Sequence, residues 1–262
     1  MNKFTKKLGA LVLSAGLAFS TCPNVFADTP KIDFIDVSHH NNDSGLSLAF
    51  YQTIKKSGIN AVVIKVSDGQ NYLDPAASVN VANAKQAGLI VNAYHYARFK
   101  SNAEAKAEAK WFDKKLQLVG FDKSKDGQVV VDVEDPTIYS HVSAASLTEY
   151  TNTFIKEMHD LGYSRVDLYT GSAFYNAHLE PKSLSVSEPW LARYPLYPET
   201  GQPQPDFSNG KGAWQWSSSY KFVGIPGVFD VSQDFSGKYT NVAKVDNATP
   251  TKVVKKIGSF PC

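Results

Sequence analysis

Runs of apolar and β-branched residues alternate along the chain with amphipathic segments, and this alternation is its main structural signal. In the segments between the runs, apolar residues recur at helical spacing, most clearly from Ala105 to Val119 at intervals of three and four. The runs predict strands at residues 32–37, 61–66, 89–96, 128–134 and 165–170. Repeated strand–helix units predict a parallel sheet with helices outside it.

Glycine marks the end of most of the predicted helices. A left-handed residue, which glycine adopts without a steric penalty, commonly ends a helix. The glycines in question are Gly58, Gly88, Gly120 and Gly162. The pair Asp74–Pro75 predicts the N-cap and first residue of the second helix. Ser146, with Glu149 three residues later, predicts a capping box at the start of the fourth.

After Gly171 the strand–helix alternation is lost. A short helix is predicted at 172–178, and the prolines within 195–212 exclude a regular helix there. Three further strand-like pieces are 190–194, 213–217 and 227–231. About eight strands with about five helices predict an α/β fold, an irregular TIM-like barrel whose last strands lack helical crossovers. A doubly wound open sheet is the alternative.

The N-terminal 27 residues have the composition of an export signal. Lys3, Lys6 and Lys7 precede an apolar run that is too short to span a bilayer, and small residues at 25 and 27 fit a cleavage site. A membrane anchor is the alternative. We therefore expect a signal peptide at 1–27, a barrel domain at 28–240 and a C-terminal extension at 241–262. The protein should be secreted, extracellular or associated with the cell wall, without stable membrane association after cleavage.

Charge and cysteine content narrow the function classes. Loss of three lysines with the signal changes the net charge from +2 to −1 (2 − 3). A nearly neutral protein does not bind phosphate backbones through bulk charge, so nucleic acid is not an expected partner. Cys22 leaves with the signal and Cys262 remains alone, which excludes an intrachain disulfide in the cleaved chain. We expect a monomer.

The fourth predicted strand carries the strongest chemical signal. Side chains alternate between the two faces of a strand, so Val130, Asp132 and Glu134 share one face and the intervening valines share the other. In parallel barrels the carboxyl ends of strands carry the active site. Two acids at such an end cannot both ionise freely, so one pKa rises, as a general acid needs. A structural salt-bridged pair or a metal site is the alternative.

Two more acids should reach the same rim. Asp36 shares a face with Ile32 and Phe34 at the end of the first strand. Asp230 is on the last strand, which lies beside the first in a closed barrel. Either residue alone is more often a turn or capping residue, but four acids converging on one rim are harder to explain structurally.

Aromatic residues gather near the same predicted strand ends. Their rings could stack on the C–H faces of sugars, although each residue taken singly could instead belong to the core. They are Tyr94, Tyr96, Tyr169, Trp190, Tyr194, Trp214 and Trp216.

Metal and cofactor chemistry are not expected. His39 and His40 are adjacent, and adjacent strand residues point to opposite faces. The other histidines are isolated, and neither an HExxH nor a paired CxxC motif is present. The polar tail could be a solvated extension or a weak wall-binding segment.

From about residue 31 to 239 the chain resembles the glycoside hydrolase family 25 lysozymes, or N-acetylmuramidases. The matching segments are Phe34–Asn41, Ile64–Gly69, Ala93–Tyr96, Asp132–Glu134, Trp190–Tyr194, Trp214–Ser217 and Phe229–Val231. Asp68 stands where the family usually has Glu.

The resemblance implies a (β/α)5(β)3 barrel and hydrolysis of the β-1,4 bond between N-acetylmuramic acid and N-acetylglucosamine. It implies that Glu134 is the acid/base and that Asp132, Asp36 and Asp230 support it. Peptidoglycan glycan strands would be the partner. The substrate-binding residues would be Tyr94, Tyr96, Tyr169, Trp190, Tyr194, Gln215 and Trp216.

The spacing of the acids favours a retaining reaction. Asp132 and Glu134 lie two residues apart, roughly 6.5 Å between Cα atoms. That separation allows Asp132 to be the nucleophile, or the substrate's own acetamido oxygen to attack while Asp132 orients it, the route we favour. A chitinase-like hydrolase and a non-catalytic wall-binding barrel are the competing functions. Asp126–Gly127 lies too far upstream for the chitinase motif.

Overall fold

The computed structural model describes residues 30–194 and 212–242. The predicted signal peptide, most of the proline-containing segment, and the C-terminal extension beyond residue 242 with Cys262 lie outside these ranges.

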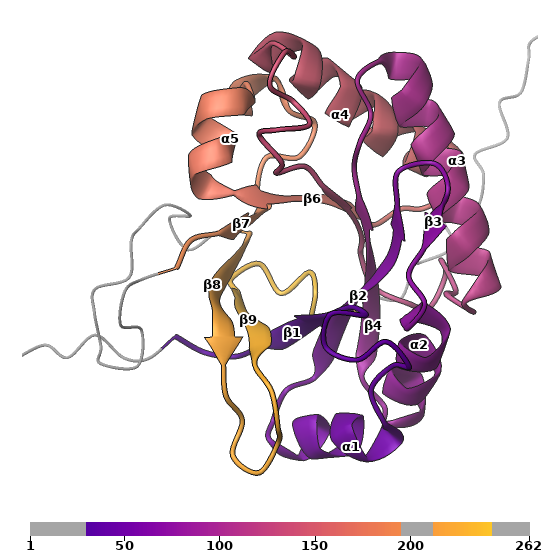
Figure 1. Ribbon diagram of the computed structural model, residues 1–262, viewed down its shortest axis with the longest axis vertical. Coiled ribbons are helices and arrows are strands. Elements are labelled where there is room, and N and C mark those ends of the chain that lie inside the picture. Colours follow the sequence, from indigo (N-terminus) through magenta and orange to yellow (C-terminus); the bar gives the residue numbers. More distant parts are fainter. Residues whose placement is uncertain (1–29, 195–211, 243–262) are drawn as a thin grey trace, which may run out of the picture.

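Eight strands close into a barrel in the order β1-β9-β8-β7-β6-β5-β4-β2, and β1 pairs with β2 to complete it (Figure 1). The barrel strands are β1 (Phe34–Val37), β2 (Ala61–Asp68), β4 (Ile90–Tyr96), β5 (Val129–Asp132), β6 (Val166–Gly171), β7 (Trp190–Ala192), β8 (Ala213–Tyr220) and β9 (Phe229–Asp234). The predicted irregular barrel is confirmed, and the open-sheet alternative is wrong.

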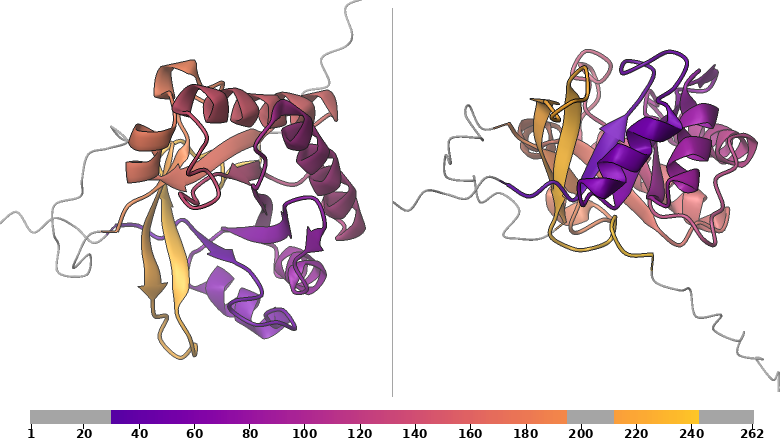
Figure 2. Two further views of the ribbon diagram at one scale, coloured as in Figure 1. Left: turned by 45° about the horizontal axis from the view of Figure 1, so that its top comes forward. Right: turned by 90° about the horizontal axis from the view of Figure 1, so that it is seen from below.

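Helices surround the barrel except where β8 and β9 form an antiparallel hairpin (Figures 1 and 2). A short loop joins β8 to the antiparallel β9, so this connection needs no crossover helix. Strand β9 is also antiparallel to β1. The helices are α1 (Leu48–Lys56), α2 (Ala77–Gln86), α3 (Asn102–Leu118), α4 (Ala144–Asp160) and α5 (Ser172–His178), with a 3₁₀ turn, η1, at Pro181–Ser183. None of these helices is both long and apolar enough to span a bilayer.

Two apolar layers hold the fold together. Val129, Val131 and Val133 belong to the outer layer between sheet and helices, whereas Val130 lies inside the barrel, as alternation predicts. Near the start of β1 the interior is filled by Tyr239, which stacks on Phe34 at 4.6 Å between ring centroids. The starts of the parallel strands are therefore plugged, so an open site in the barrel lies at the carboxyl ends of those strands.

The sequence predicted the C-terminal ends of the helices more accurately than their N-terminal starts. The four terminal glycines have φ values of 92°, 77°, 79° and 94°, so the predicted left-handed caps are confirmed. The predicted capping box is wrong: Ser143, not Ser146, caps α4, accepting the Ser146 N–H at 3.1 Å. Glu149 instead accepts a hydrogen bond from Asn102 of α3 at 2.6 Å.

Asp74 does not cap α2 directly. Its Oδ1 accepts the Ala76 N–H at 3.0 Å, and the helix begins at Ala77. The short strand β3 (Tyr72–Leu73), antiparallel to β2, was not predicted, because two residues are too few to show a period.

Candidate active site

Four carboxylates line one cavity of about 190 Å³ at the carboxyl ends of the parallel barrel strands. Asp36 lies on β1, Asp132 is the last residue of β5, Glu134 follows two residues later, and Asp230 lies on β9. The structure therefore brings together all four acids that the sequence selected.

The backbone after β5 explains the position of Glu134. The Val133 N–H donates to the Tyr169 carbonyl at 3.0 Å, so pairing with β6 continues past the last residue of the strand. Val133 consequently packs in the outer apolar layer, and Glu134 faces the cavity. Alternation thus holds for the whole Val129–Glu134 segment.

Asp36 and Asp230 are brought together by the closure of the barrel. They are direct register partners in the antiparallel β1–β9 pair. Side chains of such partners have Cβ atoms roughly 4.5–5.5 Å apart. Burial raises the pKa of Asp36 well above its usual range, the Asp230 charge raises it further, and a hydrogen bond from Gln215 opposes the rise.

Asp132 is only 4% exposed, and one of its oxygens, Oδ1, is buried without a hydrogen-bond partner among the described residues. Burial raises the pKa of Asp132 well above its usual range, and the neighbouring Glu134 adds to the rise. Lys65 acts in the opposite direction. An unsatisfied buried carboxylate oxygen is costly, which indicates a group held ready for a ligand rather than for the fold.

Glu134 lies nearer to solvent than Asp132 but keeps a raised pKa. Burial is the main cause, followed by the charges of Asp135 and Asp230, with Lys65 opposing them. These conditions favour the protonated form of a carboxyl group that faces an open cavity. Such a group can deliver a proton to a bound substrate.

A hydrogen-bonded chain of polar side chains forms the opposite wall. Tyr169 and Tyr194 both donate to Gln215 Oε1, at 2.8 and 2.6 Å. Gln215 Nε2 in turn donates to Asp36 Oδ2 at 2.9 Å. The chain fixes the amide of Gln215 and holds the Asp36 carboxylate in one orientation.

The structure places the predicted aromatic residues in three different surroundings. Tyr94, Tyr169, Trp190 and Tyr194 line the cavity together with Gln215. Tyr96 lies beside the cavity, where its hydroxyl donates to Asp135 Oδ2 at 3.3 Å.

The predicted position of Trp216 at the barrel mouth needs correction, as does that of Trp214. Both are 1% exposed and pack in the outer apolar layer. Trp216 Nε1 donates to the Lys31 carbonyl at 3.0 Å. The reason is alternation along β8: Gln215 faces the cavity, so its two neighbours face outward.

His95 and His39 each contact a buried acid. His95 is fully buried between Ser67 of β2, at 2.8 Å, and Glu108 of α3, at 2.9 Å. His39 Nδ1 contacts Asp74 Oδ2 at 2.7 Å. Within residues 30–194 and 212–242, no group of three or more His, Cys, Asp or Glu residues is arranged to hold a metal ion.

Lys65 was not identified as a site residue from the sequence. It interrupts the apolar run Ala61–Val66 and is 8% exposed, and its charge acts on both Asp132 and Glu134. Its position, two residues after the inward-facing Val63, was the available signal.

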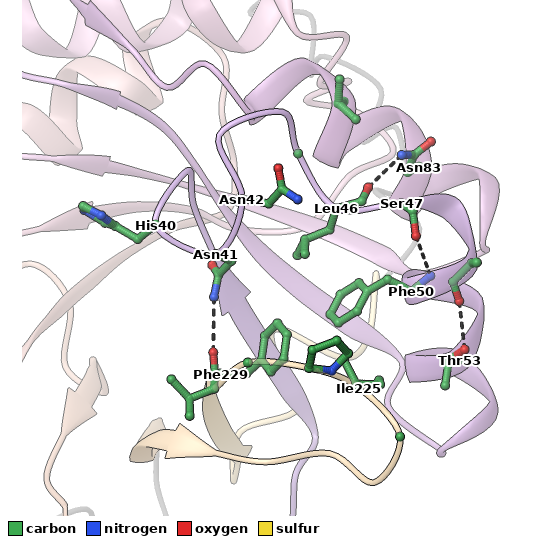
Figure 3. A pocket seen from close by; sticks show the side chains of 17 residues that line it. His40, Asn41, Asn42, Leu46, Ser47, Phe50, Thr53, Asn83, Ile225 and Phe229 are labelled. Atoms are coloured by element: carbon green, nitrogen blue, oxygen red, sulfur yellow. Dashed lines mark hydrogen bonds between the residues drawn. The ribbon is translucent and has the colours of Figure 1, made fainter.

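A larger hollow of about 770 Å³ lies outside the barrel, between α1, the β1–α1 loop and the β8–β9 loop (Figure 3). Phe50, Ile225 and Phe229 contribute its apolar surface, and Asn41 and Asn83 contribute amides. It contains no carboxylate, so the proton-transfer chemistry belongs to the smaller cavity.

Replacing Asp230 by Asn should stabilise the protein at pH 8. Burial raises the pKa of Asp230 to about 6, whereas an unfolded Asp titrates near 3.9. The folded state therefore binds more protons between these values, and the free energy of unfolding falls as pH rises through that window. We expect the variant to gain on the order of 2 kcal/mol at pH 8 and little at pH 4.

Urea unfolding at both pH values measures this effect. Asp43→Asn, which removes an exposed carboxylate, is the matched control and should change stability little at either pH. An equal gain for Asp230→Asn at pH 4 and pH 8 would contradict a titration origin.

Comparison with known proteins gives a consistent result. Residues 35–225 match the family described as glycosyl hydrolases family 25. Lysozyme M1 of Streptomyces globisporus is 28% identical over 235 residues, covering 85% of this chain and 74% of that protein. The autolytic lysozyme of Clostridium acetobutylicum is 26% identical over 196 residues, covering 74% of this chain and 54% of that protein.

The fold has counterparts among solved structures. The bacterial lysozyme of Streptomyces coelicolor superimposes with a TM-score of 0.66 at 25% identity, covering 82% of this chain and 100% of that one.

Proposed function

The chain belongs to family 25 of the glycosyl hydrolases, and we propose that it is a muramidase, cutting the β-1,4 bond between N-acetylmuramic acid and N-acetylglucosamine in peptidoglycan. Family membership confirms the resemblance seen in the sequence and makes the chain a glycoside hydrolase. The observation that carries the proposal is the cavity that Glu134 and Asp132 share, in which burial raises the pKa of both carboxyls so that one of the pair can hold a proton while the other is ionised.

Glu134 is the proposed acid. Its carboxyl proton passes to the glycosidic oxygen as the bond from that oxygen to C1 breaks, leaving an oxocarbenium-like centre. The acetamido oxygen of the same sugar then bonds to C1. In the second step the Glu134 carboxylate removes a proton from water, and the resulting hydroxyl attacks C1 and displaces the acetamido oxygen, which restores the acetamido group and gives net retention.

Asp132 is the proposed partner of the acetamido group. Its buried Oδ1, which has no partner among the described residues, can accept the acetamido N–H and so polarise the attacking oxygen. The charge of Asp230 raises the pKa of Glu134 and so supports its protonated form, and Asp36 is the register partner of Asp230 in the same cavity. Tyr94, Tyr169, Trp190, Tyr194 and Gln215 are the proposed sugar-binding residues.

The cellular setting follows from the substrate. We place the enzyme outside the membrane, released after cleavage of a signal at 1–27, with a catalytic domain at 28–240. The inner-layer position of Tyr239 supports a domain that extends to about residue 240. The intact mass of protein recovered from culture medium tests the cleavage position.

The function is tested by digesting purified cell walls and identifying the new reducing ends by mass spectrometry. A muramidase leaves N-acetylmuramic acid at each reducing end. Reducing N-acetylglucosamine would identify a different glycosidase, and binding to walls without release of fragments would identify a non-catalytic barrel.

A further inference from the structure

A separate hollow of about 460 Å³ lies on the barrel rim beside the catalytic cavity. It is formed by the loop after β1, the end of β2, the β2–β3 turn and the residues that follow β4. His39, His40, Lys65, Asp68 and Arg98 face it. The reaction proposed above uses none of them directly.

The hollow is one strand away from the proposed acid pair. Asp68 of β2 is the register partner of Tyr96 in β4, and Tyr96 is the partner of Asp132 in β5. Two strand spacings put Asp68 and Asp132 roughly 10 Å apart between Cα atoms. Lys65 Nζ is 3.7 Å from Asp68 Oδ2, 4.9 Å from the Tyr96 ring centroid and 6.0 Å from that of Tyr94, which lines the cavity. A substituent on a sugar bound in the cavity can therefore reach the hollow.

Of the charged residues that line the hollow, two are cations, Lys65 and Arg98, and one is an acid, Asp68, whereas the carboxylate of Asp74 is buried behind His39. Arg98 binds Asp68 through Nε and one terminal nitrogen, and Lys65 Nζ is 3.7 Å from the same carboxylate. One acid thus holds two cations in place. Of the five guanidinium N–H groups of Arg98, three are not used by Asp68, and this side chain is 53% exposed.

The two histidines add polar groups on the other side. The buried carboxylate of Asp74 accepts both the backbone N–H of His39, at 3.2 Å, and a hydrogen bond from its ring, at 2.7 Å. Asp74 thereby fixes the His39 ring and leaves its Nε2 for another partner. The His40 ring packs against it, with 4.0 Å between centroids.

We propose that this hollow binds the carboxylate carried by the 3-O substituent of the muramic acid sugar. The proposal rests on the muramidase function and specifies how that enzyme distinguishes muramic acid from glucosamine. The net single positive charge of Lys65, Arg98 and Asp68 suits a singly charged carboxylate, and the fork of Arg98 matches its two oxygens. Two sources share this chemistry: the lactyl carboxylate of strands without peptides, and a carboxylate of the stem peptide.

Two pairs of substrates separate the sources. The first pair is peptide-free glycan strands with the lactyl group as carboxylate or as neutral amide. The second pair is stem-bearing strands with the peptide carboxylates free or amidated. Only one of the two pairs contains the carboxylate that the hollow binds. For that pair, wild-type kcat/KM should be about tenfold higher on the charged substrate than on the neutral one, the gain expected from one charge-assisted hydrogen bond.

Arg98→Gln and, separately, His40→Ala should bring this charged-to-neutral ratio toward one. Both side chains are substantially exposed, so the fold should survive, as thermal unfolding will show. Lys114→Gln, which removes an exposed charge on α3, is the matched control and should keep the wild-type ratio.

Three outcomes are decisive. A wild-type ratio near one for both pairs overturns the proposal, as does a fall in Arg98→Gln activity that is equal on charged and neutral strands. Failure of the wild type to cleave any of the strands overturns the muramidase function instead.

Discussion

Replacing Glu134 by Gln should lower kcat on cell walls by between about 10²- and 10⁴-fold, while the protein stays folded and still binds its substrate. Gln has nearly the size of Glu but no carboxyl proton to give to the leaving oxygen. The side chain lies at the cavity mouth rather than in an apolar layer, so the change disturbs little packing. Turbidity loss of purified walls measures the rate, and co-sedimentation with walls measures binding.

Glu180→Gln is the matched control for this prediction. Glu180 is exposed, precedes η1 and lies outside the cavity, so its replacement should leave wall lysis at the wild-type rate. If Glu134→Gln lysed walls as fast as the wild type, the acid would have to be another residue of the cavity.

The barrel could be derived from the sequence because its signals are local. Helices α1 to α4 each end at a glycine, and each early strand is an apolar or β-branched run that stands out from the helical segments around it. Alternation then assigned Glu134 to the inner face without knowledge of any distance. The β8–β9 hairpin was found only in part, because the polar Ser217–Tyr220 end of β8 has no apolar pattern to reveal it.

The prediction of which side chains point into the barrel failed on β8, where the sequence pattern fits either orientation of the strand. On β8 both Trp214 and Trp216 are apolar, and an apolar residue suits either layer of a barrel. The decisive residue was the polar Gln215 between them, because its amide needs the partners Tyr169, Tyr194 and Asp36 that only the interior offers.

The rim hollow lay beyond sequence reasoning for a different reason. Lys65, Arg98 and His39 come from three separate segments, and although two of these segments match the family, neither match indicates that the three side chains meet. Their common feature is contact with two carboxylates, Asp68 and Asp74, which becomes visible only after β1, β2 and β4 have been placed side by side.

Burial of four carboxyl groups in the cavity costs folding free energy, and the neighbouring charges do not offset this cost. Desolvation is the largest cause of the raised pKa in each of Asp36, Asp132, Glu134 and Asp230. A structural ion pair would instead supply a cation for each carboxylate, and within the described residues only Lys65 has an effect of that sign on the Asp132–Glu134 pair. The arrangement favours protonation chemistry at the expense of stability.

Asp132→Asn should reduce kcat by about 10²- to 10³-fold, the loss expected when one positioned electrostatic partner of a transition state is removed. The carboxylate would no longer accept and polarise the acetamido N–H, while Glu134 could still protonate the leaving oxygen. The same wall-lysis assay measures the effect, and the exposed Asp160→Asn on α4 is the control, expected to retain the wild-type rate.

Loss of kcat in Asp132→Asn does not show which role Asp132 has. A change in the substrate, removal of its N-acetyl group, distinguishes the two roles. If the acetamido oxygen attacks C1, wild-type enzyme should lose activity on strands whose muramic acid has been de-N-acetylated, and Asp132→Asn should lose little more on them. If Asp132 itself attacks, the wild type should retain activity on those strands, and Asp132→Asn should abolish it. Both routes retain the anomeric configuration, so NMR spectra recorded in the first minutes should show the β-anomer of the new reducing end. An initial excess of the α-anomer would exclude both routes and would assign Asp132 to the activation of water.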